Sequence, residues 1–127
     1  MGSKVLIVDD DPDIREGMHV RLEHSGYDTC FATDAQSCVA VAREEAPELI
    51  ILDLGLPGGD GFLAIEQLKS CAELDVIPVI VVSARDARAN QERAIGAGAT
   101  AYLQKPVDNA EFLAVIKKAL AKCALPI

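Results

Sequence analysis

Aromatic residues are scarce in this 127-residue chain, where they make up 4% of the sequence, and tryptophan is absent. A hydrophobic core must therefore be aliphatic. Hydrophobic residues make up 50% of the chain, which suffices for the core of one domain without stabilisation by disulfides or metal ions. The sequence also lacks a hydrophobic run of membrane length and a charged-then-apolar leader. These absences predict one globular domain in the cytoplasm that does not contact a membrane.

Basic residues are fewer than acidic ones. The chain has 12 Lys and Arg residues against 20 Asp and Glu residues, which gives a formal net charge of −8. Nucleic acid backbones select clusters of Lys and Arg, so this balance argues against direct binding of nucleic acid. Metal cations or cationic partners fit the balance better.

The cysteines are too widely spaced for a zinc or redox motif. They are Cys30, Cys38, Cys71 and Cys123, and no two of them form a C-x-x-C pair. The two histidines do not complete a metal motif with them. We expect reduced thiols that are packed in the domain or exposed on its surface.

Short aliphatic runs alternate with segments of helical spacing along the chain. The runs predict strands at Val5–Val8, Leu49–Leu52 and Val76–Val82, with weaker candidates at Tyr27–Ala32 and Thr100–Gln104. Runs without polar alternation are typical of strands that are buried on both faces of a parallel sheet.

A helical segment follows each predicted strand. Asp11 suits the N-cap of the first helix and Asp108 that of the last, while Gly96 or Gly98 suits the end of the fourth. Five strand–helix units predict an α/β domain, a doubly wound five-stranded parallel sheet with helices on both faces. We expect the domain to span residues 1–122, and residues 123–127 to form a tail or the start of a linker.

Polar residues follow the predicted strands at the ends where a parallel sheet binds ligands. They are Asp9, Asp10 and Asp11 after the first strand, Asp53 after the third, Ser83 at the fourth and Lys105 after the fifth. Taken singly, Asp11 is most simply a helix cap, and the others would pass as turn or loop residues. Their joint placement at separate strand ends predicts one site instead.

Such a site has an electrostatic problem, because its carboxylates repel one another. Two carboxylates about 4 Å apart repel by about 4 kcal/mol at an effective dielectric constant of about 20. A hard divalent cation relieves this repulsion, and Mg²⁺ prefers oxygen ligands, with Mn²⁺ as an alternative. Lys105 would add a further positive charge, so that a phosphoryl group can approach the carboxylates.

Four segments of the sequence resemble the receiver domains of bacterial response regulators. They read K-V-L-I-V-D-D-D-P-D-I-R, L-I-I-L-D-L-G-L-P-G-G-D-G-F, P-V-I-V-V-S-A and G-A-G-A-T-A-Y-L-Q-K-P, in that order. The resemblance runs from Lys4 to about Ala121. It implies a flavodoxin-like (βα)5 fold with strand order 2-1-3-4-5, and a two-component switch that is set by phosphorylation.

The resemblance implies a metal-dependent phosphoacceptor site. Asp53 would be the phosphoacceptor, the nucleophile that takes a phosphoryl group from a phosphohistidine. Asp10, Asp53 and the backbone carbonyl of Gly55 would bind Mg²⁺ directly. Asp9 would support the ion through water.

It also implies the residues that bind the phosphoryl group and report its presence. Ser83, the backbone N–H of Ala84 and Lys105 would bind the phosphoryl group. Ser83 and Tyr102 would form the switch, in which Tyr102 turns inward when Ser83 moves. The Lys105–Pro106 bond matches a cis peptide of the family.

By the same resemblance the chain is a signalling switch and not an enzyme acting on a separate substrate. It would catalyse its own phosphorylation and a slow autodephosphorylation. Its partners would be a histidine kinase or phosphotransfer domain, and an output domain or downstream protein that contacts the fourth helix, fifth strand and fifth helix. The sequence does not identify the kinase, the signal or the output, and the chain could be a stand-alone regulator or part of a longer protein.

A few positions depart from the family pattern. Gly55 replaces a larger side chain, and Arg85 stands two residues after Ser83; both flank the path of attacking water, so we expect an atypical phosphoryl lifetime. Ala99–Ala101 and Val115 stand where receivers joined to winged-helix domains carry acidic residues and an Arg. The symmetric dimer of those receivers is therefore not expected.

Two other interpretations remain open. Asp9 and Asp11 form the D-x-D of a haloacid-dehalogenase-like phosphatase, in which Asp9 would be the nucleophile, although the chain lacks a cap-sized insertion. A flavodoxin-like module or a non-phosphorylated pseudo-receiver would not take up phosphate. The acids after the first strand disfavour a flavin phosphate, and no ligand residue of a receiver is missing.

Overall fold

The fold is described by a computed structural model that covers residues 3–56 and 61–124, with side chains through residue 121. The strands in these residues are β1 (Lys4–Val8), β2 (Asp28–Ala32), β3 (Leu49–Leu52), β4 (Val79–Ser83) and β5 (Ala101–Gln104). The helices are α1 (Pro12–His24), α2 (Ala35–Glu45), α3 (Gly61–Ser70), α4 (Ala87–Ala97) and α5 (Asn109–Ala124).

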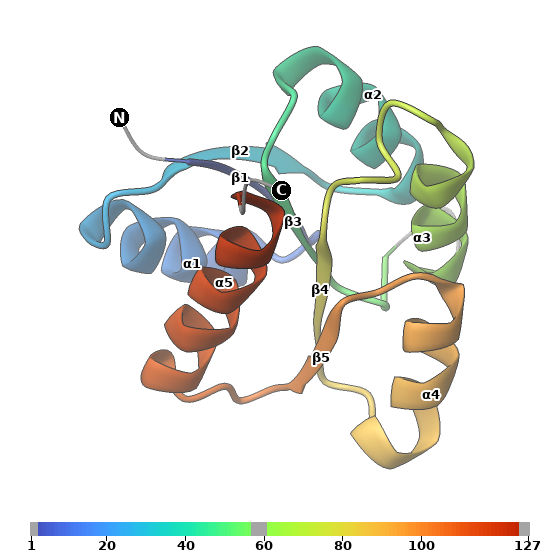
Figure 1. Cartoon of the computed structure of the whole chain (residues 1–127). Helices are drawn as coiled ribbons and strands as arrows, with labels where there is room; N and C mark the ends of the chain where they lie inside the picture. The colour runs from blue at the N-terminus through green and yellow to red at the C-terminus, as the bar shows by residue number, and fades with distance from the viewer. Residues whose placement is uncertain (1–2, 57–60, 125–127) are drawn as a thin grey trace.

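The described strands form one parallel sheet in the order β2-β1-β3-β4-β5, which confirms the predicted order. Helices α1 and α5 cover one face, and α2, α3 and α4 cover the other (Figure 1). The strand order reverses between β1 and β3, and a ligand crevice forms at such a point beyond the carboxyl ends of the strands. The fold is the predicted doubly wound, flavodoxin-like sheet.

The core lies in two layers, one on each face of the sheet. Successive side chains of a strand point to opposite faces, so β1 contributes Leu6 to the layer under α2–α4 and Val5 to the layer under α1 and α5. Phe62 on α3 and Phe112 on α5 are buried aromatic anchors in a core that is otherwise mostly aliphatic. The strands that lead to the predicted site therefore sit in close-packed surroundings.

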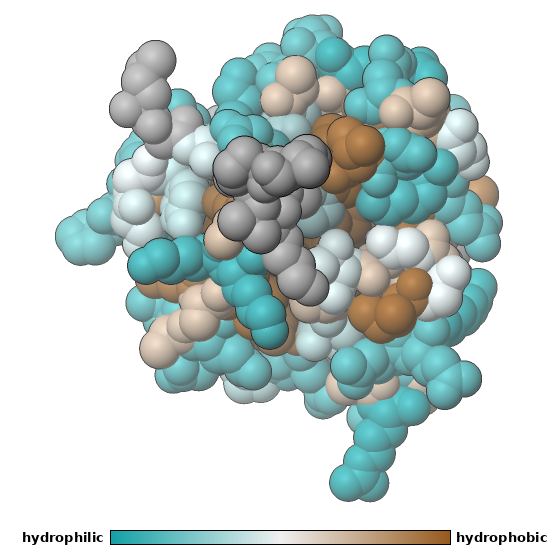
Figure 2. All heavy atoms as spheres, viewed as in Figure 1, coloured by the Kyte–Doolittle hydropathy of each residue, from teal (hydrophilic) through white to brown (hydrophobic). Residues whose placement is uncertain are grey.

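The outer surface is mainly hydrophilic, with small separate hydrophobic patches on the face drawn in Figure 2. Among the residues whose side chains are described, the large hydrophobic ones that are exposed are Val20, Phe31, Leu63, Val76 and Ile95. In the described parts of the chain, no helix is both long and apolar enough to span a membrane.

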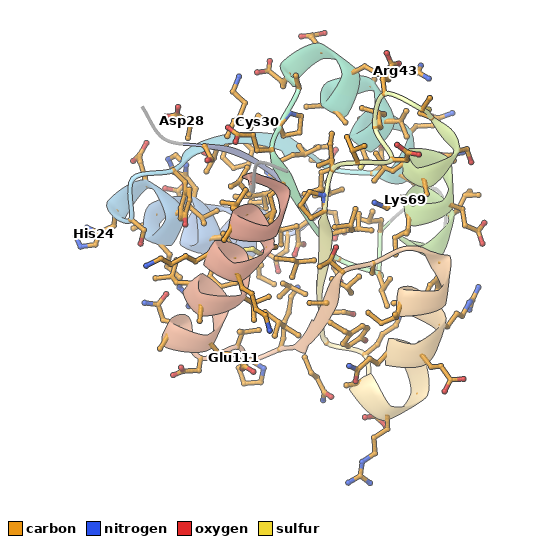
Figure 3. All side chains as sticks on the ribbon, viewed as in Figure 1. His24, Asp28, Cys30, Arg43, Lys69 and Glu111 are labelled. Atoms are coloured by element: carbon orange, nitrogen blue, oxygen red, sulfur yellow. The ribbon has the colours of Figure 1, made fainter. Side chains whose placement is uncertain are left out.

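Strand β4 begins later than the sequence predicted. Val76 is 74% exposed and lies outside the strand, which starts at Val79. Lys69, labelled in Figure 3, donates its Nζ to the backbone carbonyls of Asp75 and Ile77 at 2.9 Å each. Those carbonyls are thus bonded to a side chain, and Pro78 has no N–H to donate, so the sheet ladder cannot extend back to Val76.

The helix ends follow the predicted capping residues closely. The Asp11 side chain accepts hydrogen bonds from the N–H groups of Asp13 and Ile14 at the start of α1. Gly98, with φ of 123°, ends α4 in the left-handed region that favours glycine. Helix α5 runs through Ala124, so it includes the first two residues of the predicted tail; residues 125–127 lie outside the described part of the chain.

Candidate functional site

The ends of β1 and β3 place two carboxylates side by side. The strands pair in register, with Val8 opposite Leu52, and the next residues are Asp9 and Asp53. The Asp53 N–H donates to the Val8 carbonyl at 3.0 Å, and the Asp9 N–H donates to the Ala32 carbonyl at 3.2 Å. The sheet ladder thus continues one step beyond the strands and fixes both residues.

Asp9, Asp10 and Asp53 form what we call the acid cluster. Each offers a carboxylate oxygen, and these oxygens all lie within 4.8 Å of one another. Asp9 is buried, Asp53 is half-buried and Asp10 is exposed, so the cluster opens from the core toward solvent. Three close carboxylates repel in the absence of a cation, and their oxygen atoms are the donor set that Mg²⁺ prefers. The predicted metal residues therefore fit such an ion.

Lys105 reaches into the acid cluster from the end of β5. Its Nζ lies 3.0 Å from Asp9 Oδ2 and 3.8 Å from Asp53 Oδ2. The other Asp9 oxygen accepts a hydrogen bond from the Asp11 N–H at 3.0 Å. Burial raises the pKa of Asp9, while the Asp11 N–H and the Lys105 ammonium oppose that shift. Asp11 thus lies outside the cluster and acts on it through its backbone.

Ser83 ends β4, the strand next to β3, and its side chain is buried. The Ser83 Oγ accepts a hydrogen bond from the Arg85 N–H at 3.1 Å, and the Ser83 carbonyl accepts from the Lys105 N–H at 2.8 Å. Tyr102 is 8% exposed, and its hydroxyl donates to the Arg85 carbonyl at 2.9 Å. Ala84, between Ser83 and Arg85, is exposed.

The Lys105–Pro106 peptide is cis, as predicted. Of the sequence-predicted residues, the structure brings Asp9, Asp10, Asp53 and Lys105 into direct proximity. Ser83 and Tyr102 are linked to each other through the backbone of Arg85.

Gly55 lies directly beside the Asp53 carboxylate. Its N–H is 3.3 Å from Asp53 Oδ1, and a Cβ built on Gly55 would lie 3.8 and 4.0 Å from the two carboxylate oxygens. A side chain fits there in ordinary contact, and glycine leaves the space open. Residues 57–60, which belong to the second family-like segment, lie outside the described residues.

The sequence reasoning missed two residues that contact this region. Arg15 of α1 donates its Nη1 to the Asp9 carbonyl at 2.9 Å. Gln104 of β5 accepts a hydrogen bond at Oε1 from the Ala87 N–H at 2.9 Å. A signal for Gln104 was present, because residues two apart on a strand share a face and Gln104 stands two after Tyr102.

Comparison with known proteins places these features in a family. The model of the response regulator receiver domain matches residues 5–117. Protein PilH of Pseudomonas aeruginosa is 37% identical over 94% of this chain and 98% of its own length. The transcriptional regulatory protein KdpE of Escherichia coli is 39% identical over 94% of this chain but 52% of its own length. The chain thus spans nearly all of PilH and about half of KdpE.

Solved structures of similar fold agree. A CheY-like receiver domain protein from Methanospirillum hungatei superposes with a TM-score of 0.89, at 29% identity, over 97% of both chains. The receiver domain of sensor histidine kinase PA1611 from Pseudomonas aeruginosa has a TM-score of 0.87 and 25% identity over 95% of this chain and 99% of its own. That structure holds a magnesium ion coordinated in its active site cleft.

Proposed function

Because this chain belongs to the response regulator receiver domain family of two-component systems, we propose that Asp53 is its phosphoacceptor. The observation that carries the proposal is the position of the Asp53 carboxylate, 3.8 Å from the Lys105 ammonium and within the acid cluster. The donor would be a phosphohistidine of a histidine kinase or a phosphotransfer domain. The phosphatase and pseudo-receiver alternatives are not favoured.

In the proposed reaction an oxygen of Asp53 forms a bond to phosphorus while the phosphorus–nitrogen bond of phosphohistidine breaks. The released imidazole nitrogen keeps the electron pair and is protonated, and Asp53 becomes an acyl phosphate. Phosphoryl transfer needs positioning and charge neutralisation more than covalent help. Lys105 supplies positive charge beside the acceptor oxygen.

We assign the metal site to Asp10, Asp53 and the Gly55 carbonyl as direct ligands of Mg²⁺ or Mn²⁺. Asp9 would support the ion indirectly, since its two oxygens already accept hydrogen bonds from Asp11 and Lys105. When bound, the ion neutralises charge on the phosphoryl oxygens. The fit of the acid cluster to an oxygen-loving cation supports this assignment.

After transfer, Ser83, the Ala84 N–H and Lys105 bind the phosphoryl oxygens. Ser83 and Tyr102 then act as the switch, because the Ser83 hydroxyl accepts from the Arg85 N–H and the Tyr102 hydroxyl donates to the Arg85 carbonyl. The burial of the Tyr102 ring supports this role. The face of α4, β5 and α5 would change its preference for an output domain or downstream protein.

Several finer features belong to the same proposal. Gly55 and Arg85 set the lifetime of the phosphoryl group, since they flank the acceptor oxygen and Ser83. The chain catalyses its own phosphorylation and slow autodephosphorylation, works in the cytoplasm and does not bind nucleic acid or membrane itself. The receiver domain comprises residues 1–122. It does not form the dimer that acidic residues near Tyr102 and an Arg at position 115 support in other receivers.

The test uses a small phosphodonor, acetyl phosphate, with Mg²⁺ and intact-protein mass spectrometry. We expect wild type to gain the mass of one phosphoryl group and Asp53→Asn to gain none, because the nucleophilic oxygen is lost. Asp9→Asn distinguishes this proposal from a dehalogenase-like phosphatase, because in such a phosphatase Asp9 would carry the label. Labelling of Asp53→Asn at the wild-type level would reject the proposal.

A further inference from the structure

Helix α4 is weakly anchored in the core. Of its described residues only Ala94 is buried. The neighbouring helix α3 buries five residues: Gly61, Phe62, Ala64, Ile65 and Leu68. Ala87 and Ala97 are partly buried against the same core, and the guanidinium carbon of Arg93 lies 3.8 Å from the centre of the Phe62 ring. The position of α4 therefore depends more than that of α3 on how its ends are held.

The N-terminal end of α4 is tied to β5 at two points. The segment Ser83–Ala87, which we call the response loop, connects β4 to α4. The Tyr102 hydroxyl donates to the Arg85 carbonyl, and the Gln104 Oε1 accepts from the Ala87 N–H, each at 2.9 Å. Tyr102 and Gln104 are two residues apart on β5, so both face the α4 side of the sheet.

The other amides at this end are satisfied locally. The Asp86 side chain accepts from the Arg88 N–H at 3.1 Å, and the Asp86 carbonyl accepts from the Ala89 N–H at 3.2 Å. The Ala87 N–H alone among these three reaches a different element, through Gln104. This hydrogen bond therefore fixes where the first turn of α4 sits relative to β5.

The response loop also leads back to the proposed phosphoryl site. The Arg85 N–H donates to Ser83 Oγ, while the Arg85 carbonyl accepts from Tyr102. One peptide segment thus joins the hydroxyl of Ser83, the buried ring of Tyr102 and, two residues on, the Ala87 contact with Gln104. A shift of the backbone of the response loop therefore acts on both Ser83 and that contact.

We propose that Gln104 is a positioning residue for phosphoryl recognition: its amide oxygen holds the response loop in the conformation in which Tyr102 lies inward. This inference rests on the proposed function. A phosphoryl group that favours the inward conformation binds more tightly when that conformation is already held, by thermodynamic linkage. Loss of the Gln104 acceptor lowers the population of the inward state and so weakens phosphoryl recognition.

Two variants separate the acceptor from the size of the side chain. Gln104→Met keeps an unbranched side chain of similar length but has no oxygen to accept from Ala87. Gln104→Glu keeps the oxygen and places negative charge at a helix N-terminus, where it is favourable. Gln104 is exposed, so both variants should fold. Gln91→Met makes the same exchange at another exposed position, on α4, and serves as the matched control.

The experiment measures binding of beryllofluoride, a phosphoryl mimic, by calorimetry with saturating Mg²⁺. We expect Gln104→Met to weaken binding about fivefold, the effect of one neutral hydrogen bond, while Gln104→Glu and Gln91→Met stay within about twofold of wild type. Residue-resolved hydrogen exchange without ligand should show faster exchange at the Ala87 amide in Gln104→Met alone.

The outcomes are distinct. Wild-type affinity in Gln104→Met, or equal weakening in Gln104→Glu, overturns the inference and leaves the proposed function standing. Faster Ala87 exchange without weaker binding also overturns it, because Gln104 would then cap the helix without positioning the loop. Failure of the wild type to bind beryllofluoride at all overturns the proposed function and the inference with it.

Discussion

The acid cluster and the response loop lie at the same edge of the sheet, but different kinds of contact hold them. Asp9 and Asp53 follow strands that are buried on both faces, and their N–H groups continue the hydrogen bonds of the sheet. At Ser83 the response loop is still bonded to β5 through the backbone, by the Lys105 N–H, and beyond Ser83 it is attached to β5 by the Tyr102 hydroxyl and the Gln104 amide. The first region is held by the backbone hydrogen bonds of the sheet itself, whereas the loop beyond Ser83 relies on side-chain hydrogen bonds for its contact with β5.

The helices next to these regions repeat the contrast. Helix α3 buries Phe62, Ile65 and Leu68, so its displacement would expose large apolar surfaces at about 25 cal/mol per Å². Helix α4 buries only Ala94 among its described residues, and it ends at Gly98. The proposed phosphoryl site and the face proposed to respond to it thus lie at one edge of the sheet and differ in how firmly they are held.

Loss of the Lys105 ammonium should have the largest effect on stability, because it breaks an ion pair within the acid cluster. Lys105→Met leaves the Asp9 carboxylate, which is 1% exposed, without its cation. Removal of one partner of a buried pair costs about 3 kcal/mol, so the free energy of unfolding at about pH 7 should fall by that amount. Urea denaturation monitored by circular dichroism measures the loss.

The pH dependence of this loss identifies its cause. Burial raises the pKa of Asp9 in the folded protein, and without Lys105 the pKa should rise further. The folded variant then binds a proton more readily than the unfolded chain, so its stability deficit should shrink as the pH falls toward about 4. A deficit that stays constant from about pH 7 to about pH 4.5 would show that lost packing, not an unpaired Asp9, explains it.

A smaller effect at the same end concerns the cation. Mg²⁺ at about ten times its dissociation constant should raise the free energy of unfolding of wild type by about 1.4 kcal/mol. Asp10→Asn should stabilise the metal-free protein, because it removes one of three carboxylates that lie within 4.8 Å, and should abolish most of the Mg²⁺ effect. Thermal unfolding without Mg²⁺ tests the expected stabilisation of Asp10→Asn, and thermal unfolding with Mg²⁺ tests the expected loss of the Mg²⁺ effect. Equal Mg²⁺ stabilisation of the two proteins would contradict the metal assignment, and Asp75→Asn, at an exposed position, is the control.

The rigid region was the easier one to predict from sequence. Aliphatic runs marked β1 and β3, and an Asp directly after each run gave the acid cluster, because strand polarity alone brings those residues together. The predicted start of β4 was wrong by three residues, because the contact of Lys69 with the Ile77 carbonyl cannot be inferred from a hydrophobic run.

The response loop depends on contacts between side chains and distant backbone groups, and such contacts leave little trace in the sequence. The hydrogen bond from Ala87 to Gln104 spans 17 positions, and the sequence indicates only that Gln104 shares a strand face with Tyr102, not that it bonds to Ala87. Nor does the sequence indicate the bond of Arg15, whose guanidinium reaches the Asp9 carbonyl from α1. Periodicity predicts which faces are buried, but it does not predict which polar groups complete a loop.

The finest comparison of the two regions is the lifetime of the phosphoryl group, measured by its loss after acetyl phosphate is removed. Gly55→Asn adds a polar side chain beside the acid cluster, with its Cβ about 3.8 Å from Asp53 Oδ2. At that position the side chain can orient the attacking water. We expect decay to be faster by about fivefold. Arg85→Ala acts from the response loop and keeps the backbone bonds to Ser83 and Tyr102, so its effect should be smaller, about twofold. Gly17→Asn, at a position with no neighbour near a Cβ, is the matched control. Equal decay in wild type and both test variants would refute the lifetime assignment, and a larger effect of Arg85→Ala would reverse the order of the two regions.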